Sequence, residues 1–529
     1  MDWSTYVTPP LRLEQRFGDR VVPLFKTRPA GIWAMVEDAA ARNGDGEALV
    51  CGPVRLSWRE AQAIAARIAG GLQARGLGRG DRLALLLGNR VEFVLTLFAA
   101  ARLGLITVLL STRQQTPEIA YVLNDCGARL LLHEAVLADR LPAASETTGL
   151  LQRIAVDNDP ARSGFAALAD HAQQIDASAV VEEDTAMILY TSGTTGRPKG
   201  AMLAHGNIVH ASMIYEACLG LTQADRSIAA VPLGHVTGVV ANITSMARCA
   251  GTLIIMPEFK AGEYLKLAAR ERVTYTVIPA MYNLCLLQSD FDSHDLSSWR
   301  IGGFGGAPMP VATIEKLAAK IPGLRLVNAY GSTETTSPST LMPPDLTARH
   351  IDSVGLPCPG ASILIMDAEG RELPRGEIGE IWIGGGQVIK GYWNKPEATA
   401  ESFTAGYWHS GDLGSIDADN FVRVFDRQKD MINRGGLKIY SAEVESVLAA
   451  HPAVIESAIV ARPCPVLGER VHAVVVTREP ASAEALRSWC RERLSDYKVP
   501  DTLVVTADPL PRNANGKVMK RQLRDALTA

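Results

Sequence analysis

The stretch Thr191-Ser-Gly-Thr-Thr-Gly-Arg-Pro-Lys-Gly200, directly after the apolar run at residues 186–190, decides how the chain is interpreted. Glycines and small hydroxyl residues let backbone N–H groups approach an anion closely, and the hydroxyls add donors. Lys199 adds a positive charge. The pattern is not a G-x-x-x-x-G-K-[ST] loop, because Arg197 and Pro198 precede the lysine. A flexible turn needs no such run, so the sequence predicts a loop that binds polyphosphate.

The composition is that of an ordinary folded protein. The chain has 529 residues, 47% hydrophobic and 21% charged, and at roughly 100–200 residues per domain its length allows several domains. Its net charge of −4 gives no basic surface for a nucleic acid. It shows no uncharged run of the roughly 18 residues that span a membrane, no secretory signal, and no C-x-x-C pair among its 8 cysteines. We therefore expect a cytoplasmic protein with reduced thiols, either a monomer or a dimer.

The first part of the chain alternates between helix-like and strand-like patterns. Ser57 and Glu60 match a capping box, and the apolar spacing after them predicts a helix that stops at Gly76. A second helix is predicted over residues 91–102. Short apolar runs typical of buried strands occur at residues 81–87, 105–110, 186–190, 252–256, 275–278 and 325–328. Strands that alternate with helices predict an α/β fold with mainly parallel sheets.

The pattern changes near residue 351. Short β-like runs at 362–366, 380–383 and 421–425 predict a smaller β-rich subdomain. Further on we expect a helix capped by Ser441, strands at 458–460 and 473–476, and a helix over 485–494. The predicted organisation is a large N-terminal domain, residues 1–425, and a small mobile α+β C-terminal domain, residues 426–529, with a hinge at 426–429.

Six further motifs follow the first one in order. They are Pro232-Leu-Gly-His-Val-Thr-Gly238, Gly305-Gly-Ala-Pro308, Asn328-Ala-Tyr-Gly-Ser-Thr-Glu334, Tyr407-Trp-His-Ser-Gly-Asp-Leu-Gly414, Asp426-Arg-Gln-Lys-Asp-Met-Ile-Asn-Arg-Gly-Gly436 and Pro511-Arg-Asn-Ala-Asn-Gly-Lys517. The set resembles the motifs of the adenylate-forming superfamily, which includes acyl- and aryl-CoA synthetases, nonribosomal peptide adenylation domains and firefly luciferase. The resemblance covers nearly the whole chain, and the ordered set is specific to the superfamily.

The resemblance implies a role for each matched residue. Lys517, Glu334 and His235 would be catalytic, Glu334 and Thr191 would hold a metal ion, and Lys429 would be the hinge. The implied ATP- and AMP-binding residues are Thr191, Ser192, Gly193, Thr194, Thr195, Gly196, Lys199, Gly305, Gly306, Ala307, Pro308, Asn328, Ala329, Tyr330, Gly331, Ser332, Thr333, Asp412 and Arg427. The implied acyl pocket comprises His235, Val236, Val239, Gly302, Gly303 and Thr335, and the CoA-binding set comprises Gly435, Gly436 and Lys438.

Several of these residues also have ordinary structural explanations. Asp412 lies in a Gly-Asp-Leu-Gly sequence that would form a turn, and Arg427 and Lys429 fit a solvated charged stretch. For His235 the functional and structural explanations are about even. Arg300 is either a surface arginine, the commoner case, or a partner for a second carboxylate of the substrate.

The implied reaction explains why these residue types are needed. A carboxylate attacks the α-phosphate of ATP, so two anions must approach, and at 4 Å two unit charges interact by about 4 kcal/mol near a protein surface. Lys517, Mg²⁺ and the loop after residue 190 would offset that repulsion. We expect an ATP-dependent carboxylate–CoA ligase that uses ATP, Mg²⁺ and coenzyme A with a small carboxylic acid. Transfer to a carrier-protein phosphopantetheine, a catalytically inactive nucleotide-binding homologue and, remotely, a luciferase-like monooxygenase are the alternatives.

Overall fold

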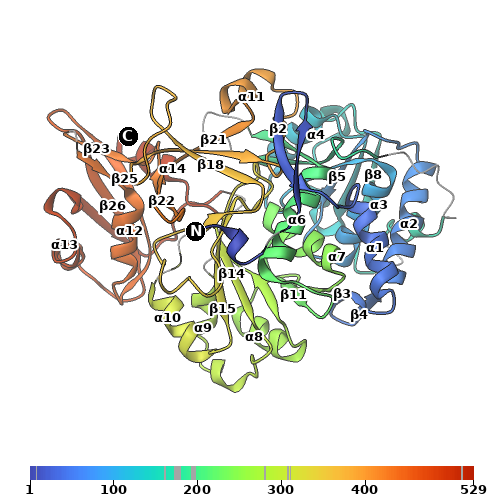
Figure 1. The fold of residues 1–529 in the computed structure, drawn as a ribbon, viewed down its shortest axis with the longest axis horizontal. Helices are drawn as coiled ribbons and strands as arrows, with labels where there is room; N and C mark the ends of the chain where they lie inside the picture. The colour runs from blue at the N-terminus through green and yellow to red at the C-terminus, as the bar shows by residue number, and fades with distance from the viewer. Residues whose placement is uncertain are drawn as a thin grey trace.

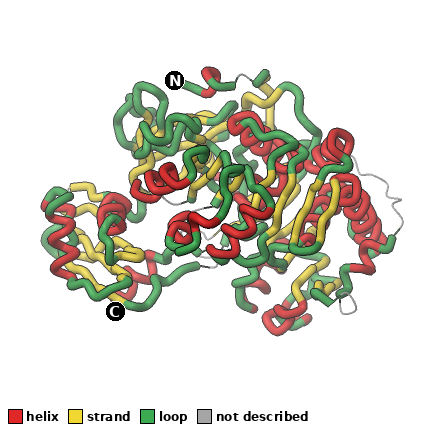
Figure 2. The backbone as a smooth tube through the Cα atoms, turned by 90° about the horizontal axis from the view of Figure 1, so that it is seen from below, coloured by secondary structure: helices red, strands yellow, loops and turns green. Residues whose placement is uncertain are grey.

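The computed structural model describes residues 1–7, 9–159, 163–171, 180–191, 198–278, 281–306, 309, 311–435, 437–513 and 516–528. The C-terminal residues form a lobe of their own at one side of a much larger body, and the two views agree on this separation (Figures 1 and 2). The larger body contains three sheets and an N-terminal hairpin, and the lobe contains one further sheet.

The first sheet confirms the predicted alternation of strands and helices. Its order is β10-β9-β6-β5-β7-β8, and every pairing is parallel except that of β10 with β9. The capping box at Ser57 forms as predicted and starts the helix at Trp58–Ala74. The strands are β5 (Arg82–Leu86), β6 (Ile106–Leu109), β7 (Leu130–Glu134), β8 (Gln152–Val156), β9 (Thr185–Thr191) and β10 (Lys199–Ala204), and the helices of this region are α2 (Trp58–Ala74), α3 (Val91–Leu103), α4 (Thr116–Cys126) and α5 (Ala166–Ala169).

The second sheet has nine strands in the order β17-β16-β15-β14-β13-β11-β12-β3-β4. The six strands from β15 to β3 pair in parallel and both ends of the sheet are antiparallel. The strands are β3 (Glu47–Cys51), β4 (Val54–Ser57), β11 (Arg226–Ala229), β12 (Thr252–Ile255), β13 (Tyr275–Val277), β14 (Ile301–Gly305), β15 (Arg325–Tyr330), β16 (Thr340–Leu341) and β17 (Leu356–Pro357). The helices are α1 (Ile32–Asn43), α6 (His205–Leu219), α7 (Ser245–Cys249), α8 (Ala261–Arg270), α9 (Tyr282–Leu286) and α10 (Val311–Lys320).

A single large hydrophobic core joins these two sheets. Residues of helices α2, α3 and α6 pack in it together with residues of both sheets, among them Phe93, Phe98 and Tyr215, each at most 1% exposed. Because the sheets share this core, the carboxyl ends of their strands are held in fixed positions relative to each other.

The predicted β-rich subdomain is the third sheet, which is antiparallel and lies on the side of the larger body that faces the lobe (Figure 1). It comprises β18 (Ala361–Met366), β19 (Gly379–Gly385), β20 (Phe403–Thr404), β21 (Tyr407–Ile416) and β22 (Val422–Arg427). The short helix α11 (Pro396–Ser402) lies between β19 and β20 in the chain. Strand β22 carries Asp426 and Arg427, so it continues across the predicted domain boundary. The N-terminal hairpin is β1 (Leu11–Arg16) and β2 (Arg20–Phe25).

The small lobe has a five-stranded sheet, in the order β24-β23-β26-β25 with β27 beside β26. Its elements are β23 (Ile432–Arg434), β24 (Leu437–Ile439), α12 (Ser441–Ala449), β25 (Val454–Cys464), β26 (Gly468–Thr477), α13 (Ala483–Arg491), β27 (Thr502–Thr506) and α14 (Lys520–Thr528). In the part of the chain that is described, no helix combines the length and the apolar character that crossing a membrane requires.

The predicted cap at Ser441 is wrong. Tyr440 holds the cap position, and Ser441 is the first residue of α12. Its backbone N–H donates to Asp426 Oδ2 and its hydroxyl donates to Asp426 Oδ1 over 3.0 Å. The aspartate therefore takes both donors at the start of the helix, and the serine side chain has no capping role. Helix α13 likewise begins two residues earlier than expected, because Ser482 caps it through the Ala485 N–H.

Candidate active site

The candidate residues lie where parallel strands end. Thr191 is the last residue of β9, Gly305 of β14 and Tyr330 of β15, and His235 follows β11 by a short loop. Open α/β sheets bind ligands outside the carboxyl ends of their strands. The third sheet adds Asp412 and Arg427 from β21 and β22.

Glu334 forms the centre of one cluster. Its side chain is buried, with 8% of the residue exposed. Its Oε1 accepts from the Thr191 hydroxyl at 3.3 Å and from the Tyr392 hydroxyl at 3.0 Å, and its Oε2 accepts from the Ser332 hydroxyl at 2.8 Å. All three donors are neutral. The cluster thus presents a buried carboxylate whose hydrogen-bond partners leave its negative charge in place.

Tyr392 is a residue of this cluster that sequence reasoning missed. Besides donating to Glu334, its ring lies 5.1 Å from the Lys199 ammonium group, in cation–π contact. Burial, followed by the nearby Glu334, raises the pKa of the Tyr392 phenol, so it stays a donor. It lies in none of the quoted motifs, and 58 residues separate it from Glu334. Only a contact in space links the two, so spacing along the chain gave no signal.

Asp412 forms a second cluster. It is 6% exposed, and its Oδ2 accepts from the Tyr330 hydroxyl at 2.7 Å while its Oδ1 lies 2.8 Å from Arg427 Nε. Asp412 and Arg427 are register partners on β21 and β22, which explains why they meet. Each carboxylate oxygen accepts more than one hydrogen bond, so both oxygens can still receive a hydroxyl donor.

The glycines beside these clusters allow close backbone packing. A Cβ on Gly305 would lie 2.1 Å from the Ala329 carbonyl oxygen, so only glycine lets β14 end so close to β15. Gly306 has a φ of +73°, a left-handed conformation that favours glycine. A Cβ on Gly331 would lie 3.1 Å from the Ser339 nitrogen. These positions bring backbone N–H groups to the strand ends.

The remaining predicted residues of this segment are Asn328, Ala329 and Thr333 of the implied nucleotide set and Thr335 of the implied acyl pocket. The Asn328 amide donates to the Ser353 carbonyl at 3.2 Å, and the Thr335 hydroxyl, fully buried, accepts from the Ser332 N–H at 2.9 Å. Ala329 is buried and Thr333 is half-buried.

His235 lies on the loop that leads from β11 into a π-helix, η5 (Thr237–Thr244). Its Nδ1 lies 3.2 Å from the Thr237 hydroxyl and 3.3 Å from the Thr237 N–H, and the ring is half-buried. Burial and then the charge of Lys517 lower the pKa of His235 to about 4, so the ring is neutral at neutral pH. Val236 and Val239 belong to the large core. A π-helical turn is rare and is frequently found at functional sites.

Lys517 is brought to this edge by the small lobe. Its backbone N–H donates to Asn513 Oδ1 and its carbonyl accepts from the Asn513 N–H, each at 2.9 Å, which forms a tight loop. The side chain is open to water on one side, yet the surrounding protein lowers its pKa below the usual lysine range by removing hydration. Arg427 lowers that pKa further, whereas Asp412 and Glu334 act in the opposite direction. Lys517 is therefore within electrostatic range of both carboxylate clusters.

The predicted CoA residues lie on a different tip of the lobe. Gly435 follows β23 and has a φ of +61°, Lys438 lies in β24, and both residues are exposed. The hinge candidate Lys429 follows β22, and burial lowers its pKa. In this structure the lobe presents the Lys517 loop to the site.

Two glycines of the predicted acyl pocket are explained by packing within the second sheet. A Cβ on Gly303 would lie 2.8 Å from Val277 Cγ2, and one on Gly302 would lie 3.0 Å from the Tyr282 hydroxyl. Arg300 is not available to a second substrate carboxylate, because Asp225 pairs with it at 2.7 Å and the Leu219 and Gly220 carbonyls accept from it. Arg300 is therefore a structural arginine at the start of β14.

Several predicted site residues lie outside the described residues. They are Ser192, Gly193, Thr194, Thr195, Gly196, Ala307, Pro308 and Gly436. Thr191 and Lys199, which flank the first group, are register partners in the β9–β10 pair.

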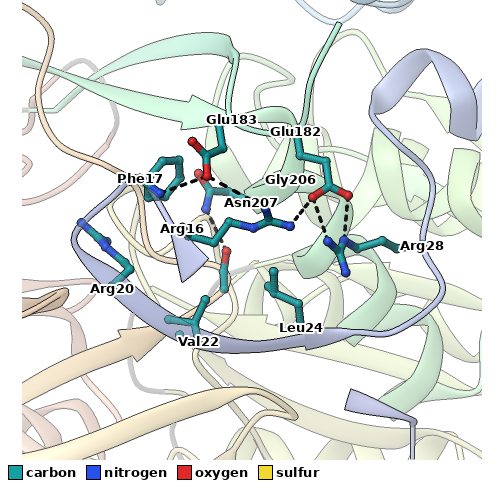
Figure 3. A pocket seen from close by; sticks show the side chains of 12 residues that line it. Arg16, Phe17, Arg20, Val22, Leu24, Arg28, Glu182, Glu183, Gly206 and Asn207 are labelled. Atoms are coloured by element: carbon teal, nitrogen blue, oxygen red, sulfur yellow. Dashed lines mark hydrogen bonds and ion pairs between the residues drawn. The ribbon is translucent and has the colours of Figure 1, made fainter. Parts of the chain in front are cut away.

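A small cavity elsewhere holds a charge cluster of a different kind. It lies behind the N-terminal hairpin, where Arg16 and Arg28 point toward Glu182 (Figure 3). Glu182 pairs with both arginines, and Arg28 lies 2.8 Å from it. The charged side chains of this cavity pair with side chains of opposite charge, whereas the hydrogen-bond partners of the Glu334 carboxylate are neutral. None of the predicted site residues lines this cavity.

Comparison with known proteins identifies the class. Residues 36–393 match the AMP-binding enzyme family, and residues 443–517 match the AMP-binding enzyme C-terminal domain. The chain is 36% identical over 482 residues to a feruloyl-CoA synthase from an Amycolatopsis species, which covers 89% of this chain and 94% of that protein. It is 34% identical over 482 residues to a long-chain-fatty-acid–CoA ligase of Mycobacterium tuberculosis, which covers 90% and 94% of the two chains.

Solved structures agree with this assignment. The o-succinylbenzoate CoA synthetase of Bacillus subtilis, in complex with its acyl-adenylate intermediate, matches with a TM-score of 0.84 and 32% identity, over 94% of this chain and 98% of that one. The same enzyme in complex with ATP and a magnesium ion matches with a TM-score of 0.83.

The chain therefore belongs to the AMP-binding enzyme family, whose members form adenylates. The predicted fold class is confirmed, and so is the predicted activity: the protein is an ATP-dependent acid–thiol ligase that makes acyl-CoA.

Proposed function

We propose that this ligase activates an organic acid with a neutral tail between the Glu334 and Asp412 clusters and then transfers the acyl group to free coenzyme A. The observation that carries the proposal is the position of Lys517, which the small lobe brings within electrostatic range of both clusters, of Arg427 and of His235.

Magnesium fits the Glu334 cluster. Among the described residues there is no group of three or more His, Cys, Asp or Glu side chains that could enclose a metal ion. Magnesium is usually held by one or two carboxylates together with substrate phosphates. A buried glutamate whose carboxylate accepts hydrogen bonds from hydroxyl groups supplies such a ligand, with Thr191 beside it. A magnesium ion bound there would neutralise phosphate charge.

In the first half-reaction a carboxylate oxygen of the acid forms a bond to the α-phosphorus of ATP, and the bond from that phosphorus to the pyrophosphate oxygen breaks. Lys517 would hold the two approaching anions with its ammonium group. Asp412 would accept hydrogen bonds from ribose hydroxyls, with Arg427 and Tyr330 fixing its orientation. His235, neutral at neutral pH, would contact the acid without adding charge. Lys199 would hold the outer phosphates.

In the second half-reaction the thiol sulfur of coenzyme A forms a bond to the acyl carbon, its proton is lost, and AMP leaves. Gly435 and Lys438 are exposed, so we propose that the small domain rotates about Lys429 to bring these residues to the site. The boundary between the domains would then lie at residues 426–429. The cytoplasmic location stays a prediction.

The class of acid follows from the charges available. Arg300 is held by Asp225. Val236 and Val239 beside His235 are apolar. With Lys517 engaged by the reacting carboxylate, these observations favour an aliphatic or aryl tail over a second carboxylate. The relatives named for ferulic and long-chain fatty acids support this choice, whereas the relative named for o-succinylbenzoate, a dicarboxylic acid, is the reason that dicarboxylic acids belong in the test.

The test is exchange of labelled pyrophosphate into ATP with magnesium and a panel of aliphatic, aryl and dicarboxylic acids, followed by acyl-CoA formation. We expect exchange with acids that have neutral tails and consumption of free CoA. Exchange restricted to dicarboxylic acids would contradict the proposed acid class. Adenylate formation without CoA consumption would favour a carrier-protein acceptor.

A further inference from the structure

Asn89 lies on the loop between β5 and α3, far in sequence from every motif of the site. Its side-chain oxygen accepts from the Leu233 N–H at 2.8 Å. Its side-chain nitrogen donates to the Val231 carbonyl at 2.9 Å and the Met256 carbonyl at 3.0 Å, with the Ala229 carbonyl at 3.5 Å. An amide has one acceptor oxygen and two N–H donors, so every hydrogen-bonding group of Asn89 is used.

These partners define where Asn89 acts. Val231 follows the end of β11 and Met256 follows the end of β12, so the amide fixes both strand exits to the first sheet. Leu233 lies two residues before His235. The His235 N–H donates to the Pro232 carbonyl at 3.1 Å, and the His235 carbonyl accepts from the Val239 N–H at 2.9 Å. The segment from Leu233 to η5 is therefore a continuous hydrogen-bonded unit whose start Asn89 fixes.

We infer that Asn89 is a positioning residue for the acid-binding step: it sets the place of His235 through the loop at residues 231–235. This inference rests on the proposed function of His235 at the acid. Asn89 itself contacts neither the Glu334 cluster nor the Asp412 cluster in the hydrogen bonds of the described residues. Its loss should therefore act on the acid and leave the nucleotide largely unaffected.

The chain offers a matched control at the other end of the same strand. Asn43 donates through its side-chain nitrogen to the Ala250 carbonyl at 3.0 Å, just before β12, whereas Asn89 holds the Met256 carbonyl just after it. Both are asparagines that fix the main chain around β12, but only Asn89 reaches the His235 loop.

The experiment measures the KM of acid and of ATP in pyrophosphate exchange for the wild type, Asn89→Ala, Asn43→Ala, His235→Ala and the double variant of Asn89 and His235. We expect Asn89→Ala to raise the KM of the acid by about tenfold, a size typical of lost buried hydrogen bonds, and to change the KM of ATP by less than about twofold. Asn43→Ala should change neither the KM of the acid nor the KM of ATP. His235→Ala should lower kcat/KM less in the Asn89→Ala background than in the wild type, because the two residues act in series.

Equal rises in both KM values, or additive effects of the two substitutions, would overturn the inference. A second measurement does not need activity: hydrogen–deuterium exchange of residues 231–240 should increase in Asn89→Ala and not in Asn43→Ala. Unchanged hydrogen–deuterium exchange of residues 231–240 would also contradict the inference. Asn89→Ser serves if the alanine variant does not fold. If the wild type activates no acid but Asn89→Ala increases the hydrogen–deuterium exchange of residues 231–240 as expected, the function proposed for the site is refuted. The role of Asn89 in positioning the loop then still holds.

Discussion

The small lobe has two tips that differ sharply in their surroundings. The Lys517 loop lies among the charges of the large domain, and Gly516 beside it lies near Arg113, whose Nη1 is 4.0 Å from where a Cβ on that glycine would be. At the other tip, Gly435 after β23 and Lys438 in β24 are exposed. One domain thus carries one group in the site and another outside it. If the lobe serves both chemical steps, as proposed above, it has to change orientation between them, and the orientation described here would fit the first step.

The largest effect should come from Lys517→Ala. Loss of the ammonium group leaves the approaching carboxylate and phosphate without their mobile cation, so adenylation should fall by about a hundredfold or more. Measured separately, conversion of a supplied acyl-adenylate to acyl-CoA should be nearly unchanged. Equal losses in both steps would contradict the assignment of the Lys517 loop to adenylation alone.

Lys429→Pro should be next. Proline fixes φ and stiffens the segment about which the lobe is proposed to turn. We expect overall acyl-CoA formation to fall on the order of tenfold or more, with one half-reaction retained. Stopped-flow measurement of each half-reaction identifies which one, and normal rates in both would remove Lys429 as the hinge.

Tyr392→Phe tests the large-domain side of the comparison. The substitution keeps the ring beside Lys199 and removes the hydroxyl that donates to Glu334. A hydrogen bond to a charged group contributes about 1.5–3 kcal/mol, so the Mg²⁺ concentration for half-maximal exchange should rise by about tenfold. Manganese binding followed by electron paramagnetic resonance, in the presence of ATP, gives a readout independent of turnover. An unaltered requirement would exclude Tyr392 from supporting the metal ligand.

The pH dependence of adenylation should report Lys517. Because its pKa lies below the usual lysine range, the ammonium is lost at lower pH than for an ordinary lysine, and kcat/KM should fall as pH rises through that value. Lys517→Arg should keep its charge and move the alkaline limb to higher pH. If both proteins have the same limb, another group titrates. His235, with a pKa of about 4, should contribute no limb near neutrality.

The smallest effect should come from Lys438→Glu on the exposed tip. Reversal of one exposed charge should raise the KM of CoA by about threefold to fivefold at low salt and less at high salt. Pyrophosphate exchange should not change, since Lys438 is exposed and is proposed to act only in the second half-reaction. A loss of exchange would mean that Lys438 acts in the first step.

Most of the fold could be predicted because its signals are local. The buried runs of β5, β9 and β15 and the capping box of α2 depend on neighbouring residues only. Ser441 could not be predicted, because the donors at the start of α12 are taken by an aspartate 15 residues away. Motif order indicated Glu334, Asp412 and Lys517 by resemblance, whereas Tyr392 and Asn89 act through contacts that no local pattern records. For Arg300 the sequence left a substrate contact open, and only its partners in space, Asp225 and the Leu219 and Gly220 carbonyls, exclude that role.

The contact between Asp426 and Ser441 has a consequence for the resting state of the enzyme. Asp426 precedes Lys429 and Ser441 follows it, so a turn about Lys429 would pull the carboxylate away from both donors. The pair is buried, and the cost of leaving such groups unpaired would favour the present arrangement when no substrate is bound. Without substrate the small lobe would then stay in the orientation proposed for adenylation. Its rotation to the orientation proposed for the reaction with coenzyme A would need free energy that becomes available once the adenylate has formed.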